Sequence, residues 1–352
     1  MSRVLVLHTG GTIGMREGPR GFAPVRGALA EELARRPPLC DPSLSDPAAG
    51  TFVTAPFEDG ARVHYVLEEY DPLLDSANLD LSHWARFAHH LGREYASYDG
   101  FVLLHGTDTM SYTASALSFV LEGLGKPVVL TGSQIPLARV RSDGLSNLLS
   151  ALWFAGESHL PEVMLAFHQR VLRGNRSTKR DASGLDAFDS PNFPMLGEIG
   201  IDLRIHRDRA LPPPTVPFRV NDALSPNVAA LRLYPGMTRD ILENFLRAPL
   251  EGLVLETYGS GNAPDTRADL MGVIEEATQR GVIVLNVTQC LKGTVSAAYQ
   301  AGRVLADVGV LPGADLTAEA ALTKLSWLLG QRLERAEIER LLVTPLRGEL
   351  TR

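Results

Sequence analysis

The chain has 352 residues, of which 45% are apolar and 21% charged, and its formal net charge is −7 at pH 7. This length suffices for about two domains with buried cores, and the composition is that of a globular protein rather than a disordered or fibrous one. The negative charge and the lack of a strong basic cluster argue against nucleic acid as a partner.

Short apolar runs followed by turns rich in Gly, Ser, Thr or Asn predict strands of a parallel α/β sheet. In chain order these runs are Arg3–Leu7, Phe101–Leu104, Val128–Leu130, Val163–Phe167, Gly252–Leu255 and Val282–Leu285. Apolar residues at helical spacing predict helices at Ser111–Leu124, Asp143–Ala155, Thr266–Arg280 and Thr317–Leu329. Thr317 is a suitable N-cap for the last of these helices.

A proline-rich stretch separates two sets of predicted strands. It contains Pro212, Pro213, Pro214, Pro217 and Pro226, and prolines lack the backbone donor that a regular helix needs. We therefore predict an α/β protein of two domains. The larger N-terminal domain, with a mostly parallel sheet, covers residues 1–204, a linker covers 205–226, and a smaller C-terminal α/β domain covers 227–352.

Ligands of open parallel sheets bind beyond the carboxyl ends of the strands, so the loops after the strands are the candidate site. Two of these loops combine glycine with threonine, Thr9-Gly10-Gly11-Thr12-Ile13-Gly14 and His105-Gly106-Thr107-Asp108-Thr109-Met110. Their glycines permit tight turns that expose backbone N–H groups. A threonine hydroxyl near a carboxylate suits acyl transfer, because a threonine must be activated before it attacks an amide.

The two threonine loops and the residues near them also fit functions other than acyl transfer. Phosphate binding is disfavoured because no Lys follows Gly14, neither loop contains GxGxxG, and Asp108 would repel an anion. One such loop alone is equally compatible with a turn whose threonine caps the next helix. Lys179 lies among arginines and also fits a basic surface loop, and His105 fits a buried structural histidine. No cluster of His, Asp and Glu has the spacing of metal ligands.

The cysteine content and the N-terminus bear on the cellular compartment. Cys40 and Cys290 are the only cysteines and lie far apart in the sequence, which excludes a CxxC pair and favours a reducing compartment. The apolar run at residues 4–7 is shorter than a secretory signal core, and no run approaches the about 20 residues of a membrane span. We expect a cytoplasmic protein without membrane association.

The two threonine loops resemble the two signature segments of the L-asparaginase/glutaminase family. The resemblance covers essentially the whole chain, and the missing signal peptide makes it similar to the cytoplasmic type I branch. It continues through Asp75-Ser76, Thr131-Gly132-Ser133-Gln134-Ile135-Pro136, Arg141-Ser142-Asp143-Gly144, Arg173-Gly174-Asn175-Arg176 with Lys179, Tyr258-Gly259-Ser260-Gly261-Asn262 and Leu346-Arg347-Gly348-Glu349-Leu350.

The resemblance implies an amidohydrolase that converts L-asparagine to L-aspartate and ammonia. Thr12 would be the nucleophile that attacks the side-chain amide carbon, giving a β-aspartyl ester. Thr107, Asp108 and Lys179 would form a second catalytic group, in which the ammonium lowers the proton affinity of the Thr107 hydroxyl or of a bound water. No metal ion or organic cofactor is implied.

The resemblance also implies roles in holding the substrate. Asp108 has the charge to bind the α-ammonium group, and Ser76 with neighbouring backbone N–H groups would bind the α-carboxylate. Asp75 is a further substrate-binding residue that the resemblance implies. The backbone amides of Gly11 and Thr107 are candidate oxyanion donors, and the Ser133 carbonyl is a candidate acceptor for the leaving nitrogen. The family forms homodimers or tetramers, in which Asn262 would lie at the edge of a neighbour's site.

Two positions depart from the type I pattern. The lid position that commonly holds a tyrosine is Phe22 here, which cannot relay a proton. Tyr299 is the nearest alternative phenol in the family pattern, although it also fits a core aromatic residue. An arginine that helps form an allosteric asparagine site in some type I enzymes is replaced by Glu256, whereas Thr288-Gln289-Cys290 is present.

The sequence therefore predicts an L-asparaginase, with two alternatives that remain open. One is a weakly active amino-acid-binding sensor that has kept the pocket. The other is an asparaginase-like amidotransferase subunit, which the lack of an additional N-terminal domain disfavours.

Overall fold

The computed structural model describes residues 1–19, 21–295 and 300–351, which fold into two compact units. The first unit comprises Met1–Ser190 and Pro194–Asn221, and the second comprises Pro191–Phe193 and Asp222–Arg352. Most of the proline-rich stretch expected to be a linker packs with the first unit: Arg219–Val220 pairs with Leu121–Glu122, and the Phe218 ring stacks 3.6 Å from that of Tyr95. The first unit thus extends beyond residue 204.

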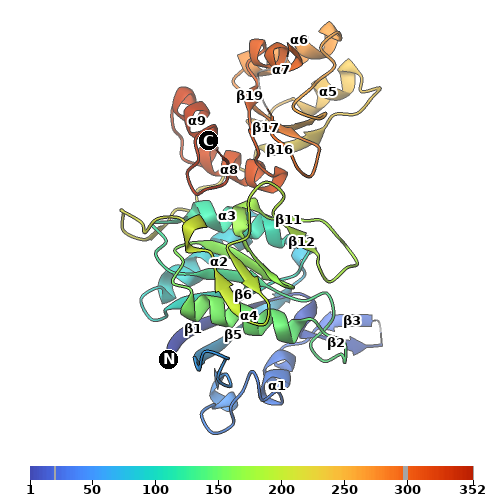
Figure 1. The fold of residues 1–352 in the computed structure, drawn as a ribbon. Coiled ribbons are helices and arrows are strands. Elements are labelled where there is room, and N and C mark those ends of the chain that lie inside the picture. Colours follow the sequence, from blue (N-terminus) through green and yellow to red (C-terminus); the bar gives the residue numbers. More distant parts are fainter. Residues whose placement is uncertain (20, 296–299, 352) are drawn as a thin grey trace. The chain divides into compact units, whose positions relative to one another are not determined.

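Nine strands of the described residues form one sheet in the first unit (Figure 1). In spatial order they are β14 (Leu203–Ile205), β13 (Gly197–Ile199), β10 (Arg170–Arg173), β9 (Val163–Phe167), β8 (Val128–Thr131), β6 (Gly100–Leu104), β1 (Ser2–Gly10), β5 (Val63–Leu74) and β4 (Thr51–Val53). The five central strands from β9 to β5 are parallel, and antiparallel strands complete both edges. This confirms the mostly parallel sheet.

The central strands form where apolar residues run without interruption. All five residues of β6 are buried, and so are the four of β8, as expected of parallel strands covered on both faces. β5 escapes the sequence prediction because only alternate residues in its first half, Val63, Tyr65 and Leu67, are buried. The residues that follow include Glu68, Glu69 and Pro72, which no apolar pattern marks as strand.

Helices cover both faces of this sheet. They are α2 (Leu81–Glu94), α3 (Met110–Val120) and α4 (Gly144–Glu157), whereas α1 (Ala28–Ala34) packs against the loop segments η1 (Thr12–Gly14) and η2 (Pro47–Ala49). α4 packs against β1, β6 and β8, whereas α3 packs against β9 and α2 on the opposite face (Figure 1). α3 ends at Val120 rather than near Leu124, because β7 (Leu121–Glu122) pairs there with β15 (Arg219–Val220).

The second unit is a smaller parallel sheet with helices. Its strands are β16 (Val228–Arg232), β17 (Gly252–Thr257), β18 (Ile283–Thr288) and β19 (Leu311–Pro312), in that spatial order. Its helices are α5 (Arg239–Phe245), α6 (Ala268–Gln279), α7 (Gln300–Asp307), α8 (Ala318–Gly330) and α9 (Arg335–Leu342). Thr317 caps α8 by accepting a hydrogen bond from the Ala320 N–H, as its sequence predicts. Among the described helices, none has both the length and the apolar content needed to cross a membrane.

The order of strands in the first unit creates a place for a ligand. β1 lies between β5 on one side and β6 on the other, so the chain leaves β1 toward one edge and later returns to its opposite side. The position where the chain changes direction in this way is a switch point, and open α/β sheets bind their ligands in the loops that follow the strands there. Both threonine loops begin there.

Candidate active site

Glycines bring the backbones of three loops together at the switch point. A Cβ on Gly10, whose φ is 138°, would lie 2.0 Å from the Leu74 oxygen at the end of β5. A Cβ on Gly11, whose φ is 84°, would lie 2.6 Å from the Gly106 nitrogen in the loop after β6. Only glycine fits these close approaches. Thr12 directly follows Gly11 and opens a short 3-10 helix, η1 (Thr12–Gly14).

The loop after β5 is held against the loop after β6. A Cβ on Gly106 would lie 2.4 Å from the Ser76 hydroxyl, which is therefore adjacent to that backbone. The Thr109 hydroxyl donates to the Ser76 carbonyl at 2.8 Å. Asp75 caps η3 (Ser76–Asn78) by accepting from the Ala77 N–H at 3.0 Å. These contacts place Asp75 and Ser76 beside the loop of Thr107 and Asp108.

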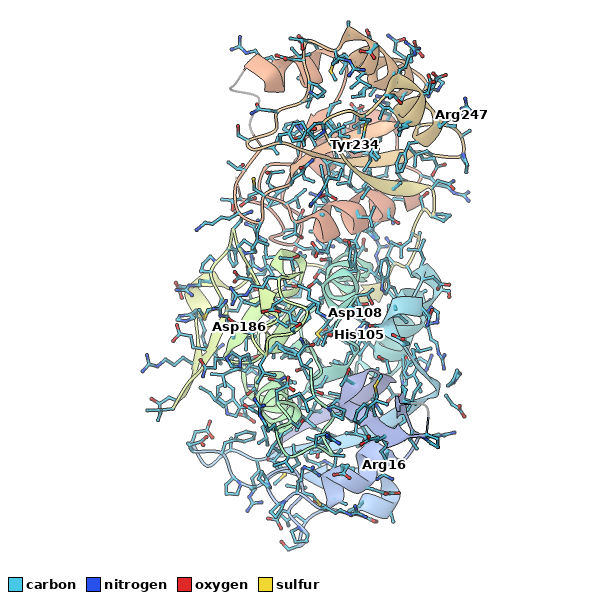
Figure 2. All side chains as sticks on the ribbon, turned by 90° about the vertical axis from the view of Figure 1, so that its right-hand side faces the viewer. Arg16, His105, Asp108, Asp186, Tyr234 and Arg247 are labelled. Atoms are coloured by element: carbon cyan, nitrogen blue, oxygen red, sulfur yellow. The ribbon has the colours of Figure 1, made fainter. Side chains whose placement is uncertain are left out.

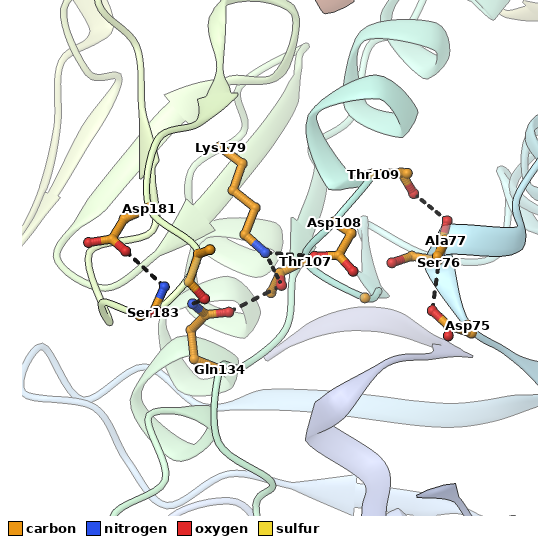
Figure 3. Close-up of polar contacts among 12 residues, drawn as sticks. Asp75, Ser76, Ala77, Thr107, Asp108, Thr109, Gln134, Lys179, Asp181 and Ser183 are labelled. Carbon is orange, nitrogen blue, oxygen red and sulfur yellow. Dashed lines mark hydrogen bonds and ion pairs between the residues drawn. The ribbon is translucent and has the colours of Figure 1, made fainter. Parts of the chain in front are cut away.

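Lys179 reaches both residues of that loop (Figure 3). It lies on β11 (Thr178–Lys179), which pairs with β12 (Phe188–Asp189). Its Nζ donates to the Thr107 Oγ1 at 2.9 Å and to the Asp108 Oδ1 at 2.8 Å. An ammonium that donates a hydrogen bond to a hydroxyl oxygen stabilises negative charge that develops on that oxygen. The predicted group of Thr107, Asp108 and Lys179 therefore assembles.

The neighbouring arginines distinguish Lys179 from a basic surface loop. Arg173 forms a buried ion pair with Glu162 at 2.6 Å, and Arg180 pairs with Asp186 and Asp189. Each of these arginines has its own carboxylate partner. The Lys179 side chain is only 19% exposed, whereas its partner Asp108, labelled in Figure 2, is 65% exposed. The ammonium is therefore largely covered, while the carboxylate is accessible to solvent.

Gln134 belongs to the site, although the sequence marks it only as part of a motif. The Thr107 Oγ1 donates to the Gln134 Oε1 at 3.1 Å, and the Gln134 Nε2 donates to the Gly184 carbonyl at 3.0 Å. Asp143 fixes the loop by accepting from the Gln134 N–H at 3.0 Å. Since Lys179 donates to Thr107, the Thr107 proton is directed to Gln134. The available signal was the position of Gln134 in the loop after β8.

The adjacent Ser133 is fully enclosed. Its hydroxyl is buried and has no hydrogen-bond partner among the residues that the structure describes. A Cβ on Gly132 would lie 2.4 Å from the His105 carbonyl, so this loop also contacts the loop after β6.

His105 is a structural residue. Its Nδ1 donates to the Gly106 carbonyl at 2.7 Å, and its Nε2 accepts from the Thr113 hydroxyl at 2.9 Å. Thr113 in turn accepts from the Trp84 Nε1 at 3.0 Å. Burial lowers the pKa of His105 to about 4, so the ring is neutral and its tautomer is set by these partners.

Thr12 and Gly11 differ in what they offer a substrate. Thr12 is half-buried, and within the described part of the chain its hydroxyl has no hydrogen-bond partner. The Gly11 N–H already donates to the Leu74 carbonyl at 3.3 Å. In this arrangement the Gly11 amide is engaged in the fold, so its role as an oxyanion donor stays a prediction.

The remaining predicted site residues are Asn262 and Tyr299. Asn262 belongs to the second unit, where its backbone pairs with that of Tyr258. Tyr299 falls outside the described residues. Across residues 1–19, 21–295 and 300–351, no group of three or more His, Cys, Asp and Glu side chains is arranged to hold a metal ion.

Comparisons with known proteins agree with this geometry. Residues 3–211 match the N-terminal domain model of asparaginase, and residues 227–342 match the glutaminase/asparaginase C-terminal domain. The chain is 45% identical to L-asparaginase 1 of Escherichia coli (strain K12) over 349 residues, 99% of this chain and 98% of that protein.

Two solved structures share the fold over nearly the full length. L-asparaginase I from Vibrio cholerae has a TM-score of 0.86 and 41% identity, covering 99% of both chains. The thermostable L-asparaginase from Thermococcus kodakarensis has a TM-score of 0.84 and 33% identity, also covering 99% of both chains. Given the family models across both units and these full-length relatives, the chain belongs to the asparaginase family.

Proposed function

We propose that this protein is an L-asparaginase that hydrolyses L-asparagine to L-aspartate and ammonia. The observation that carries the proposal is the contact of the Lys179 ammonium with both Thr107 and Asp108, beside the loop of Thr12. The full-length similarity to L-asparaginases supports the choice of substrate.

The first half of the proposed reaction uses Thr12. Its Oγ1 attacks the side-chain amide carbon, the resulting C–O bond replaces the C–N bond, and the nitrogen leaves as ammonia after it gains a proton. The Thr107 backbone N–H stabilises the oxyanion, and the Ser133 carbonyl accepts from the leaving nitrogen. Thr12 suits this step because its hydroxyl is not engaged by other described residues.

The second half removes the aspartyl group from Thr12. A water attacks the ester carbon, the bond to Thr12 breaks, and the hydroxyl recovers its proton. Thr107, Asp108 and Lys179 orient this water and stabilise the charge that develops on it. Asp108 also has a second carboxylate oxygen with which to bind the substrate α-ammonium, and the Ser76 hydroxyl donates to the α-carboxylate. Asp75 caps the short helix that carries Ser76.

Ammonia release from purified protein at millimolar L-asparagine tests the proposal. We expect turnover in the wild type, its loss in Thr12→Ala, and partial retention in Thr12→Ser, which keeps a hydroxyl. Binding of asparagine without ammonia release would instead identify a sensor. Ammonia release only with an aminoacyl ester acceptor would identify an amidotransferase subunit.

We further propose a cytoplasmic homodimer or homotetramer in which Asn262 completes the site of a neighbouring copy. Closed symmetry is the usual arrangement of soluble oligomers. The molar mass from light scattering tests the assembly, and Asn262→Ala should raise KM. A monomer with full activity would overturn this part.

A further inference from the structure

The fully buried His8 lies directly behind the turn that carries Thr12. It is on β1, where it pairs in register with Glu69 of β5, and its Nδ1 donates to the Glu69 Oε1 at 3.0 Å. The other ring nitrogen, Nε2, is buried and has no hydrogen-bond partner among the described residues. Among the described residues, the carboxylate of Glu69 therefore makes the only hydrogen bond to this ring.

The free side of the ring supports Gly14, the last residue of η1. A Cβ on Gly14 would lie 2.5 Å from the His8 Cε1 and 2.7 Å from its Nε2. The backbone of the turn Thr12–Gly14 thus packs directly on the imidazole, with no side chain between them. A change in the position of this ring must change the support of Thr12, since interiors are close-packed.

The same carboxylate holds a second point of the chain. The Glu69 Oε2 accepts from the Gly27 N–H at 2.7 Å, and Gly27, with a φ of 78°, is the N-cap of α1. Burial alone would raise the pKa of Glu69, but the hydrogen bonds from His8 and Gly27 outweigh it and hold the pKa below its ordinary value. Glu69 is consequently an anion that accepts two hydrogen bonds.

The two contacts hold the two ends of one segment. Between Gly14 and Gly27 the chain forms the hairpin of β2 (Met15–Gly18) and β3 (Gly21–Pro24), which carries Phe22. His8 supports the start of this segment and Glu69 holds its end. One hydrogen-bonded pair, His8 with Glu69, therefore supports both the Thr12 turn and the end of the segment at Gly27.

We propose that His8 and Glu69 are positioning residues for the reaction of Thr12. They touch neither the substrate nor the reacting atoms in this proposal, and they act by holding the backbone of residues 12–14 and 27. The proposal rests on the proposed hydrolysis for its kinetic consequence. Its structural consequence, a fixed backbone at residues 12–14 and 27, is independent of turnover.

The neighbouring residue on β5 provides a matched control. Glu68 accepts from the His90 Nε2 at 3.0 Å, the same kind of pair at the same distance as Glu69 with His8. Successive residues of a strand point to opposite faces, so Glu68 has no part in holding the hairpin. Glu69→Gln and Glu68→Gln each remove one charge from one histidine–glutamate pair.

The kinetic test compares these variants on L-asparagine. We expect Glu69→Gln to lower kcat by about tenfold or more, because a misplaced nucleophile reacts slowly. KM should change by less than about threefold, since Asp75, Ser76 and Asp108 lie on other loops. Glu68→Gln should leave both constants near wild type. Equal kinetics of the two variants, or a change confined to KM, would overturn the proposal.

A double substitution tests the contact between the ring and the turn. Gly14→Ala should lower kcat, because its methyl group collides with His8. In the Gly14→Ala/His8→Ala double variant this collision is gone, so its kcat should equal that of His8→Ala alone. If the fold-losses in kcat of the two single variants multiply in the double variant, the two positions act independently, which contradicts the proposal.

Hydrogen–deuterium exchange gives a readout that needs no turnover. Glu69→Gln should speed exchange in residues 11–27, and Glu68→Gln should not. If the wild type releases no ammonia but exchange responds in this way, the proposed function fails while the positioning pair stands. Unchanged exchange in Glu69→Gln would overturn the pair, whatever the activity of the wild type.

Discussion

The Lys179 ammonium lies 2.8 Å from a carboxylate oxygen of Asp108, a residue 71 positions earlier in the chain. An ion pair with one partner 65% exposed contributes little to the free energy of unfolding. The pair is better explained by its effect on Thr107, whose hydroxyl oxygen accepts a hydrogen bond from the same ammonium. Figure 3 shows the three side chains with Gln134 completing the group.

Replacement of Lys179 should therefore affect chemistry far more than stability. We expect Lys179→Met to lower kcat for L-asparagine by about 10²- to 10⁴-fold, the usual contribution of general acid–base catalysis. The melting temperature should stay close to that of the wild type. Lys179→Arg should not restore activity, because a planar guanidinium cannot meet Thr107 and Asp108 as a compact ammonium does. Steady-state ammonia release and thermal denaturation measure both effects.

Arg180 is the matched control for this prediction. It follows Lys179 directly but pairs with Asp186 and Asp189. Arg180→Gln should keep kcat within about twofold of the wild type, because it breaks only partly exposed ion pairs. A loss of kcat as large as that of Lys179→Met would show that the loop, rather than the ammonium, matters.

Sequence patterns predict best the parts of this fold that are locally determined. β1, β6 and β8 follow from uninterrupted apolar runs, and the candidate loops follow from their ends. β5 was missed because Glu68 and Glu69 break its pattern, and these charges find partners only in the folded chain.

The side-chain pairings of the site depend on tertiary structure. No local signal indicates that Lys179 reaches Thr107, 72 positions away, or that Gln134 accepts a hydrogen bond from Thr107. The engagement of the Gly11 amide by Leu74 depends on the close approach of two loops. The resemblance to a known family supplies the candidate residues, whereas only the fold shows which of their atoms meet.

Substrate selectivity should favour asparagine over glutamine with residual glutaminase activity. The two amides differ by one methylene group, which a shaped pocket discriminates by about 1–3 kcal/mol, or roughly 10- to 200-fold. We expect kcat/KM for L-asparagine to exceed that for L-glutamine within this range. Equal values of kcat/KM for the two amides would contradict the prediction.

The kinetics should be hyperbolic. The resemblance to type I enzymes implies that Glu256 stands where some of them have an arginine of an allosteric site. In the structure Glu256 accepts from the Arg232 Nη2 at 2.8 Å and Nε at 3.0 Å. Arg232 is the only guanidinium that contacts Glu256 among the described residues, and its charge is already paired with that carboxylate rather than available to an effector carboxylate. We expect a Hill coefficient of one for L-asparagine, both in the wild type and in Arg232→Gln. A coefficient clearly above one would reveal an effector site.

Activation of Thr12 should not require a phenol at position 22. Phe22 lies on β3, 45% exposed, with the Arg139 guanidinium carbon 5.6 Å from its ring centroid. We propose that Phe22 is part of an apolar lid and that Tyr299, which lies outside the described residues, relays the Thr12 proton. Tyr299→Phe should then lower kcat, and Phe22→Tyr should leave it unchanged. An unchanged kcat in Tyr299→Phe, with a raised kcat in Phe22→Tyr, would mean that Tyr299 has no such role.

His105 should make the folded state sensitive to acid. Burial lowers its pKa from 6.5 to about 4, so between these values the unfolded chain binds a proton that the folded chain does not. The contribution of His105 to the free energy of unfolding is therefore fully present above pH 6.5 and is lost as the pH falls through 4.

The slope attributable to this one residue is about 1.4 kcal/mol per pH unit in that window. A His105→Gln variant, which cannot titrate, should be less stable than the wild type at pH 7.5, because the contacts to Gly106 and Thr113 are disturbed. The difference in the free energy of unfolding between the two proteins should shrink steadily from pH 6.5 to pH 4, as measured by urea denaturation at each pH. A difference that stays constant over this range would show that His105 takes up its proton equally well in the folded protein.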